Sequence, residues 1–263
     1  MQLNKWITRS IGILVAIAAA AFATGSASAD GYYQRRGVAP VAGCANFGGF
    51  YVGGNIGWAT LTAHQNDLNG FTSLGADTAT SFTSKDDSFS AGAQVGYNLQ
   101  KSCTLLGIEA DWNWADLNAD TRVFPGVTGL LNDSFRTRVE NFGTIRTRTG
   151  VVVDQLLLFV TGGFAWADTR DSVNFTPVGL LGERFSKSDT QWGWTAGFGT
   201  EYALAPGVSL TSDVLYLTFT DQDHSFTTPA GRFQIKSDED IWVARMGINI
   251  HFGDRREFVA PLK

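Results

Sequence analysis

The amino-acid sequence predicts an all-β protein, built as an eight-stranded antiparallel up-and-down transmembrane β-barrel. Three observations predict this fold. Apolar and polar residues alternate with a period of two in eight segments, the gaps between these segments are alternately short and long, and the tryptophans gather toward one end of the segments. Because successive side chains of a strand point to opposite faces, each segment has one apolar face and one polar face.

The alternation is plainest in residues 107–114, GIEADWNW. Trp112 and Trp114 fall on one face of a strand, and Glu109 and Asp111 fall on the other. In a membrane barrel the aromatic face contacts lipid and the charged face lines the interior. The sequence therefore predicts tryptophans outside and carboxylates inside.

The other expected strands follow the same period. In chain order the first four are residues 50–61, 88–99, 104–117 and 139–151. Their apolar faces carry Phe50, Ile56 and Trp58; Phe89, Val95 and Tyr97; Ile108, Trp112 and Trp114; and Ile145 and Val151. The last four are residues 156–168, 190–203, 208–219 and 240–252. Their apolar faces carry Leu158, Phe164 and Trp166; Trp192, Trp194 and Phe198; Val208, Leu210, Val214 and Tyr216; and Trp242, Ile248 and Phe252.

The alternation is weakest in the seventh segment, where Leu215 and Leu217 occupy the polar face. Each segment has about 12 residues, slightly more than the about 9–11 that cross the hydrocarbon of a membrane at a tilt.

The expected connections separate into two kinds. The long ones are residues 62–87, 118–138, 169–189 and 220–239, and the short ones are residues 100–103, 152–155 and 204–207. Long loops at one end and tight turns at the other are typical of outer-membrane barrels. A soluble sandwich is not expected to segregate its loops in this way.

Aromatic residues on the apolar faces predict two girdles at the membrane surfaces. The girdle near the long loops consists of Trp58, Trp112, Trp114, Trp166, Trp192, Trp194 and Trp242. The girdle near the short turns consists of Tyr97, Tyr202 and Phe252. The alternative, a soluble barrel with tryptophans in its core, does not require them to cluster at one rim.

The polar faces predict a charge network inside the barrel. It consists of Glu109, Asp111, Arg146, Arg148, Glu201, Asp213 and Arg245. An eight-stranded barrel has an interior that side chains can fill, and arginine can donate to two carboxylates at once. The network is therefore interpreted as structural filling, with a narrow gated path for ions or solutes as the alternative.

The N-terminus predicts export. Lys5 and Arg9 precede an apolar run and the small-residue site Ala27-Ser28-Ala29, which is the pattern of a cleavable signal peptide. The expected organisation is a signal peptide at residues 1–29, a loose periplasmic leader at 30–47, the barrel at 48–252 and a C-terminal tail at 253–263. Beyond the signal, no run of 18 apolar residues predicts a transmembrane helix.

The only two cysteines, Cys44 and Cys103, precede the first expected strand and lie in the first short turn, respectively. Both positions belong to the short-turn end of the barrel. Because an exported protein folds in an oxidising compartment, the sequence predicts a disulfide between them.

Other classes of function find little support. A net charge of −5 does not favour nucleic-acid binding. His64 and His224 are expected in long loops and His251 inside the barrel, without a motif for catalysis, so no enzyme is expected. The acids Asp221, Asp223, Asp238, Glu239 and Asp240 are expected to form a solvated anionic rim, because their spacing matches no calcium loop. No cofactor and no metal site are expected.

Several stretches resemble one family of small outer-membrane barrels. They are residues 49–57, GFYVGGNIG; 106–112, LGIEADW; 142–148, FGTIRTR; 158–165, LFVTGGFA; and 246–252, MGINIHF. Together they are similar to the porin-family surface antigens of rhizobia and brucellae, which have an OmpA-like barrel domain.

The resemblance implies an outer-membrane location in a Gram-negative cell, a role in envelope integrity and surface loops that act as antigens. Some members are described as porins, so a low-conductance porin is the alternative function. Implied partners are outer-membrane lipids, lipopolysaccharide and the barrel-assembly machinery, and the oligomeric state stays open. Haem binding, described for a few relatives, has no supporting loop motif here. Family members usually end at the final aromatic residue, whereas residues 253–263 follow Phe252 here.

Overall fold

The computed structural model describes residues 43–67, 80–123, 133–175, 183–220, 222–228 and 231–252. The expected signal peptide, most of the leader and the tail lie outside these residues. Strands dominate the described part of the chain, in which no helix is long and apolar enough to cross a membrane.

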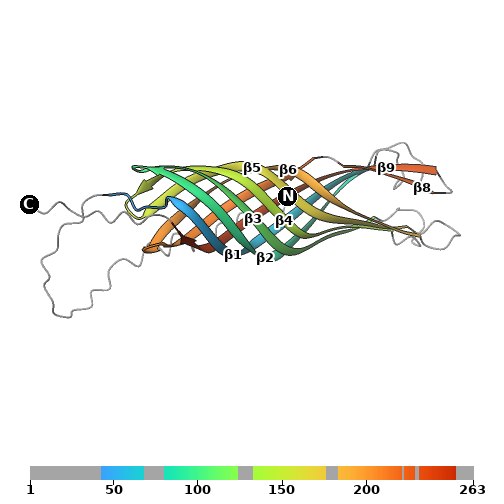
Figure 1. The fold of residues 1–263 in the computed structure, drawn as a ribbon. Coiled ribbons are helices and arrows are strands. Elements are labelled where there is room, and N and C mark those ends of the chain that lie inside the picture. Colours follow the sequence, from blue (N-terminus) through green and yellow to red (C-terminus); the bar gives the residue numbers. More distant parts are fainter. Residues whose placement is uncertain are drawn as a thin grey trace, which may run out of the picture. The chain divides into compact units, whose positions relative to one another are not determined.

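Nine strands form one antiparallel sheet that closes on itself (Figure 1). They are β1 (Gly49–Asp67), β2 (Thr80–Lys101), β3 (Thr104–Val123), β4 (Asp133–Val153), β5 (Leu156–Phe175), β6 (Glu183–Ala205), β7 (Val208–Phe219), β8 (Gln222–Thr228) and β9 (Gly231–His251). Consecutive strands from β1 to β7 are neighbours in space, and β9 pairs with β7, with β8 and with β1, which closes the wall.

The wall has eight positions, because β7 and β8 pair in succession with the same strand. β7 pairs with β9 from Val208 to Thr218, and β8 pairs with it from Gln222 to Thr228. The predicted eight-stranded up-and-down β-barrel is confirmed. Closure leaves no unpaired strand edge in the part of the wall that crosses the membrane. A bilayer requires this, because lipid cannot form hydrogen bonds with the backbone.

Most strands are longer than the sequence predicts. β1 has 19 residues and β6 has 23, against about 12 expected. The segments predicted as long connections therefore consist largely of strand. The physical reason is visible in β3, where alternation continues past Trp114 with its polarity inverted: Leu117 and Ala119 are buried, and Asp116 and Asp120 are exposed.

Two-residue turns join the strands at the short-turn end, as expected. They are Ser102–Cys103, Asp154–Gln155 and Pro206–Gly207. Gly207 has a φ of 80°, a left-handed conformation that glycine adopts without steric cost.

The residues just before β1 are not a loose leader. Phe47 is buried, its backbone N–H donates to Gln100 Oε1 at 2.7 Å, and the backbone N–H of Ala45 donates to the carbonyl of Asp154. Burial of an aromatic ring is the reason, since it removes a large apolar surface from water. The prediction of a loose segment is thus wrong for residues 44–47.

Candidate functional site

The interior of the barrel consists of three layers along its axis. A short-turn layer contains Phe47, Leu105, Val152, Leu157 and Phe159. The charge network lies in the middle. A long-loop layer above it contains Ala59, Leu61, Ala63, Ala115, Leu117, Ala119, Val139, Phe142, Ala165, Ala167, Leu215, Leu217, Phe219, Ile241 and Val243.

In the charge network, Glu109 of β3 accepts hydrogen bonds from two guanidinium groups, and a third, that of Arg245, lies 3.6 Å from its Oε1. Arg146 of β4 contacts Glu109 Oε1, and Arg148 Nη1 lies 3.2 Å from Glu109 Oε2. The hydroxyl of Tyr51, on β1 two strands away, donates to the same carboxylate at 2.5 Å. Three donors satisfy this buried anion, which would otherwise be costly in a dry environment.

Arg148 links Glu109 to a carboxylate on a strand that is not its neighbour. Its Nη2 contacts Glu201 Oε2 of β6. The guanidinium also lies 4.6 Å from the centroid of the Phe159 ring, which is a cation–π distance. Arg148 is 2 % exposed, so these contacts take the place of hydration of its guanidinium group.

Asp111, Asp213 and Arg245 form the second half of the charge network. Arg245 binds Asp213 through two hydrogen bonds of 2.7 and 2.9 Å and lies 3.2 Å from Asp111 across the lumen. Arg146 lies 3.0 Å from Asp111 and thereby joins the two halves. Bidentate arginine–carboxylate pairs hold a definite geometry, so the network is expected to be rigid.

Glu201 has a polar shell of its own. Ser209 donates to its Oε1 at 2.5 Å, Asn249 donates to it at 3.0 Å, and His251 Nε2 lies 2.9 Å away. His251 also contacts the ring of Phe47 at 6.0 Å between centroids. The imidazole is therefore enclosed between the charge network and the short-turn layer.

The structure thus brings all seven predicted network residues together inside the barrel. Their neutral hydrogen-bond partners were not predicted, namely Tyr51, Asn113, Thr144, Ser209 and Asn249. Their signal was available, because each lies at an inward-facing position of its strand. A polar residue on the face opposite an apolar stripe is the pattern that would have identified them.

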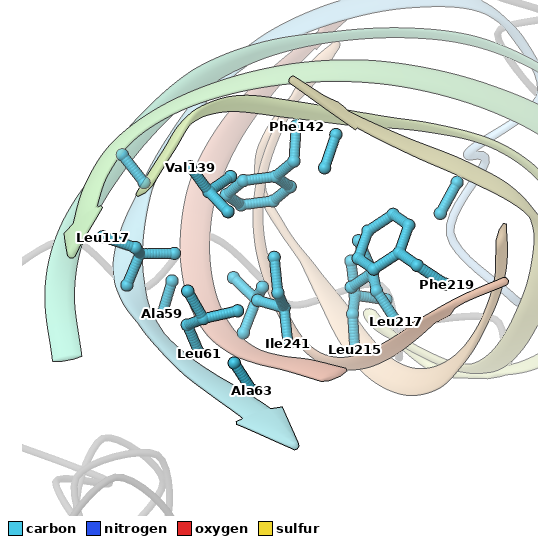
Figure 2. Packing of buried hydrophobic residues seen from close by; sticks show 14 of the residues in the cluster. Ala59, Leu61, Ala63, Leu117, Val139, Phe142, Leu215, Leu217, Phe219 and Ile241 are labelled. Carbon is cyan, nitrogen blue, oxygen red and sulfur yellow. The ribbon is translucent and has the colours of Figure 1, made fainter. Parts of the chain in front are cut away.

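The two layers that flank the charge network consist of buried apolar side chains. In the long-loop layer Phe142, Leu217 and Ile241 project from the wall into the interior (Figure 2). Leu215 and Leu217, which weaken the alternation of β7, belong to this layer. They face inward because the interior is apolar at this level.

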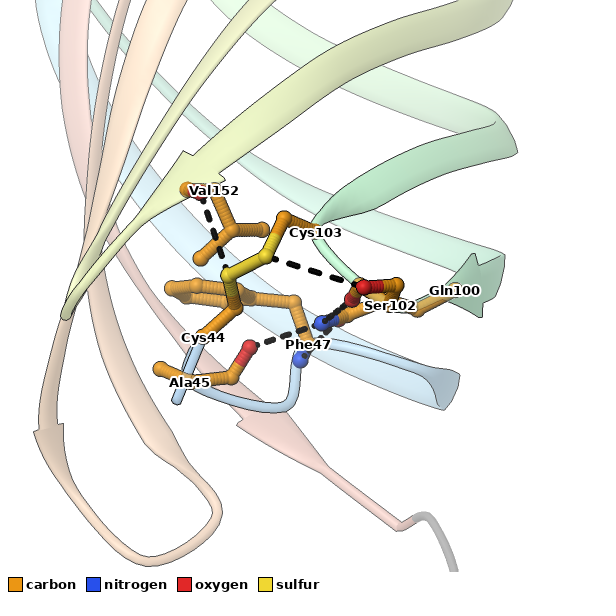
Figure 3. The surroundings of a disulfide bond; sticks show 7 residues. All are labelled: Cys44, Ala45, Phe47, Gln100, Ser102, Cys103 and Val152. Atoms are coloured by element: carbon orange, nitrogen blue, oxygen red, sulfur yellow. Dashed lines mark hydrogen bonds between the residues drawn. A yellow bond between two sulfur atoms is a disulfide. The ribbon is translucent and has the colours of Figure 1, made fainter. Parts of the chain in front are cut away.

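A disulfide holds the short-turn layer in place (Figure 3). It joins Cys44 to Cys103, whose Cα atoms are 5.4 Å apart, and so attaches the segment before β1 to the turn between β2 and β3. Gln100 Nε2 donates to the carbonyl of Ala45 at 2.8 Å beside it. The predicted disulfide is confirmed, and it anchors the segment that carries Phe47.

The outer surface carries the predicted aromatic residues. Six of the seven tryptophans are about half exposed, Trp166 is partly exposed, and Tyr97, Tyr202 and Phe252 are exposed near the opposite end of the wall. Trp112, Gly143, Trp166 and Trp192 stand side by side on β3 to β6. A Cβ on Gly143 would collide with the ring of Trp166, so this glycine makes room for a continuous aromatic row.

Beyond the tryptophans the outer surface becomes charged. Arg138 lies 3.1 Å from Asp116 and 3.3 Å from Glu140, and Arg136 lies 3.3 Å from Asp120. The hydrogen bond from Asn118 and the charge of Arg138 lower the pKa of the Asp116 carboxyl. The change from an aromatic to an ionic surface within a few residues marks a boundary between lipid and water.

Other predicted residues have different positions from those expected. Glu239 is not part of a solvated rim but is buried on the inner face of β9, because the rim residues continue a strand. Asp238 and Asp240 are partly exposed on the opposite face, and Asp223 lies on β8. Asp221 lies outside the described residues. His64 and His224 lie on β1 and β8 and not in loops.

A model of the family described as outer membrane protein beta-barrel domain matches residues 13–238. The chain belongs to this family. It is an outer-membrane β-barrel protein, and the resemblance stated from sequence is confirmed. The predicted location in the Gram-negative outer membrane is confirmed as well.

Related proteins of known name are also outer-membrane proteins. The 31 kDa outer-membrane immunogenic protein of Brucella melitensis biotype 1 is 28 % identical over 255 residues, which cover 91 % of this chain and 99 % of the relative. The 22 kDa outer membrane protein of Rhizobium leguminosarum bv. viciae is 23 % identical over 81 % of this chain and 82 % of the relative. Among solved structures, the outer membrane protease OmpT from Escherichia coli aligns with a TM-score of 0.49 at 9 % identity, over 78 % of this chain and 97 % of OmpT.

Proposed function

We propose that this protein is a closed structural barrel that contributes to the integrity of the outer membrane and presents the outer ends of its strands to the exterior. The observation that carries the proposal is the sealed interior. Arg146 and Arg148 are 1 % and 2 % exposed, and fully buried apolar side chains lie on both sides of them. An ion on this path would leave water for an apolar layer, which is strongly unfavourable.

The alternative function, a low-conductance porin, is favoured only by the charge content of the interior. A porin interior is polar and filled with water along its whole length. Here the charges are buried and contact one another, and the long-loop layer consists of buried apolar side chains. The structural role therefore has the stronger support.

Single-channel recording tests this choice. Purified protein, reconstituted in planar bilayers after its folding is established by heat-modifiable migration, is expected to give no steady conductance. The expected reason is the long-loop layer, so a variant with Phe142→Ala, Leu217→Ala and Ile241→Ala serves as the matched comparison. Reproducible conductance of the unaltered protein would overturn the structural proposal in favour of the porin.

We also propose that the protein has no enzymatic activity. Inside the barrel, His251 and Glu201 form a pair from which acid–base catalysis could be built. The His251 side chain is 6 % exposed and lies under Phe47, so a substrate has no access to it.

The lipid partners follow from the outer surface. We propose that the two aromatic girdles lie at the two headgroup levels, with lipopolysaccharide around the tryptophans and phospholipid around Tyr97, Tyr202 and Phe252. About ten residues of each strand lie between the girdles, as a tilted strand needs for the hydrocarbon. We further propose that the barrel-assembly machinery recognises the end of β9, including Phe252, despite the residues that follow.

A charge introduced between the girdles tests this placement. Val160 of β5 is 57 % exposed and lies about midway between the two girdle levels, so Val160→Arg should lower the free energy of unfolding in lipid vesicles by about 2–4 kcal/mol. Ser188→Arg, on the outer face of β6 beyond the tryptophans, is the control and should change it by less than about 0.5 kcal/mol. Equal effects of the two substitutions would contradict the placement.

A further inference from the structure

The barrel wall is continuous between the girdles but divides beyond the tryptophans. The ladder between β2 and β3 ends at the pair Ser90 and Ala115. Both strands continue outward, β2 back to Thr80 and β3 on to Val123. In these outer halves β2 pairs with β1, and β3 pairs with β4, so a seam separates them.

A second seam lies on the opposite side of the wall. The ladder between β6 and β7 ends at Gly193 and Phe219, just after which the Thr220 N–H donates to the Trp192 carbonyl at 3.1 Å. β6 continues outward in pairs with β5, whereas β8 pairs with β9.

The two seams are four strands apart, and they divide the outer wall into two four-stranded sheets. The first outer sheet has the order β8-β9-β1-β2, and the second has the order β3-β4-β5-β6. In Figure 1, β8 and the outer end of β9 lie apart from a second group of strand ends.

Contacts between the outer sheets are mostly side-chain contacts near their base. The long-loop layer contributes residues from both sheets, among them Leu61 of β1 and Leu117 of β3. One polar bridge crosses the first seam, where Asp86 Oδ2 accepts from the Asn118 N–H at 2.6 Å. Apolar contacts have no fixed direction, so they restrain rotation less than a ladder of backbone hydrogen bonds does.

Glu239 of the first outer sheet faces the second outer sheet above this base. It is 2 % exposed. Burial first, and then the charge of Asp171 on β5, raise the pKa of Glu239 to about 8, and Gln191 of β6 and Ser237 offset part of the effect. Asp171 itself accepts from the Thr137 hydroxyl at 2.8 Å.

Among the described side chains near Glu239 in register, His64 and Lys187 are exposed and not packed against it. Ala63 of β1 stands directly opposite it, and His64 is exposed on the outer face. Lys187 of β6 is opposite Asp171 in register, yet its ammonium group is exposed and lies 3.4 Å from Asp189. Lys236, Asp238 and Asp240 occupy the alternate positions of β9, which face outward.

We propose that the two outer sheets are hinged at the tryptophan level and that Glu239 is their latch: the sheets close when Glu239 is protonated and part when it is ionised. The inference rests on the proposed position of the tryptophans at the outer membrane surface. The cylinder between the girdles stays closed in both states, because its ladders and charge network are unbroken.

The direction of the pH effect follows from linkage. Parting the sheets returns Glu239 to water, where its pKa is about 4.5, whereas in the closed state it is about 8. Closure is therefore fully favoured below about pH 4.5 and is weakened as the pH rises toward about 8. Within this window the ratio of open to closed molecules should rise about tenfold per pH unit.

Distances between spin labels test the latch in the full-length protein in lipid vesicles. Because both native cysteines are in the disulfide, Thr62→Cys on the first outer sheet and Ser188→Cys on the second can be labelled specifically. Pulsed electron–electron double resonance should show a longer and broader distribution of distances between the two labels at pH 9 than at pH 5. Glu239→Gln should keep the pH 5 distribution at both values, whereas the exposed control Glu140→Gln should behave as the unaltered protein.

A distribution that is the same at pH 5 and pH 9 in the unaltered protein would overturn the proposal, as would a shift that survives Glu239→Gln or disappears in Glu140→Gln. Hydrogen exchange read by mass spectrometry gives a second measurement that needs no substitution. Amides of residues 80–89 and 116–123 should exchange faster at pH 9 than at pH 5, after correction for intrinsic exchange, relative to those of residues 91–101. An unchanged ratio also overturns it.

Should Glu239→Gln fail to migrate as a folded barrel, Asp171→Asn replaces it. This variant removes the repulsion that favours parting, so the open fraction at pH 9 should be smaller than in the unaltered protein. An open fraction at pH 9 equal to that of the unaltered protein would overturn the role of the Asp171 charge. Conductance recorded at pH 5, where the sheets are closed, tests the structural function alone, so failure of this proposal is distinguishable from failure of the structural function.

Discussion

Arg148→Met is expected to lower the free energy of unfolding by about 3–5 kcal/mol, which is the usual cost of removing one partner of a buried ion pair. The substitution leaves Glu201 without its guanidinium partner and removes one of the donors to Glu109. Both carboxylates stay buried, and neither has access to water. Methionine is a suitable replacement because it has a similar length and no charge.

The effect can be measured by urea titration of the protein in lipid vesicles, followed by tryptophan fluorescence. Arg138→Met on the same strand is the control, because Arg138 is 40 % exposed in its side chain and its ion pairs lie in water. This control should cost no more than about 1 kcal/mol. Adding Glu201→Gln to Arg148→Met should recover part of the loss, since the uncompensated anion is then neutral. Equal losses for Arg148→Met and Arg138→Met would show that the network does not hold the interior.

Replacing both cysteines, with Cys44→Ser and Cys103→Ser, is expected to cost about 2–4 kcal/mol. The disulfide closes a loop with a sequence separation of 59 residues, and opening it increases the entropy of the unfolded chain. In the folded state, loss of the disulfide also releases the segment that carries Phe47. Burial of that ring depends on the short span between Cys44 and β1.

The measurement is the urea midpoint with and without a reductant. The unaltered protein should lose stability when it is reduced, and the double variant should be insensitive to reductant. As a structural readout, proteolysis should cleave the segment before β1 faster in the double variant. A midpoint equal to that of the unaltered, oxidised protein would contradict the assigned role of the disulfide.

Much of the part between the girdles could be predicted from sequence because one physical rule governs it. A lipid exterior demands apolar side chains, and strand geometry then sends every second residue inward. The alternation alone therefore predicts that Trp112 and Glu109 lie on opposite sides of the barrel wall. The cysteines were paired for a related reason, because consecutive strands and short turns bring both to one end.

Beyond the tryptophans the same rule failed. Asp116 and Leu117 alternate as well as Glu109 and Ala110 do, but the wet face is now outside. Without the barrel, a segment with charged residues and no lipid-facing stripe is indistinguishable from a loop. Glu239 was misplaced for this reason: a rim was expected where a buried position of β9 exists.

By itself the sequence determined the fold class, the inward and outward faces of the membrane part and the residues of the charge network. Only the tertiary structure decided which charges meet. Arg148 of β4 reaches Glu201 of β6, and Arg245 of β9 reaches Asp111 of β3, because closure brings strands that are not neighbours to one axis. The tertiary structure also decided where the wall divides into two sheets. Alternation sets the direction of each side chain, but the pairing of strands depends on long-range closure that no local pattern contains.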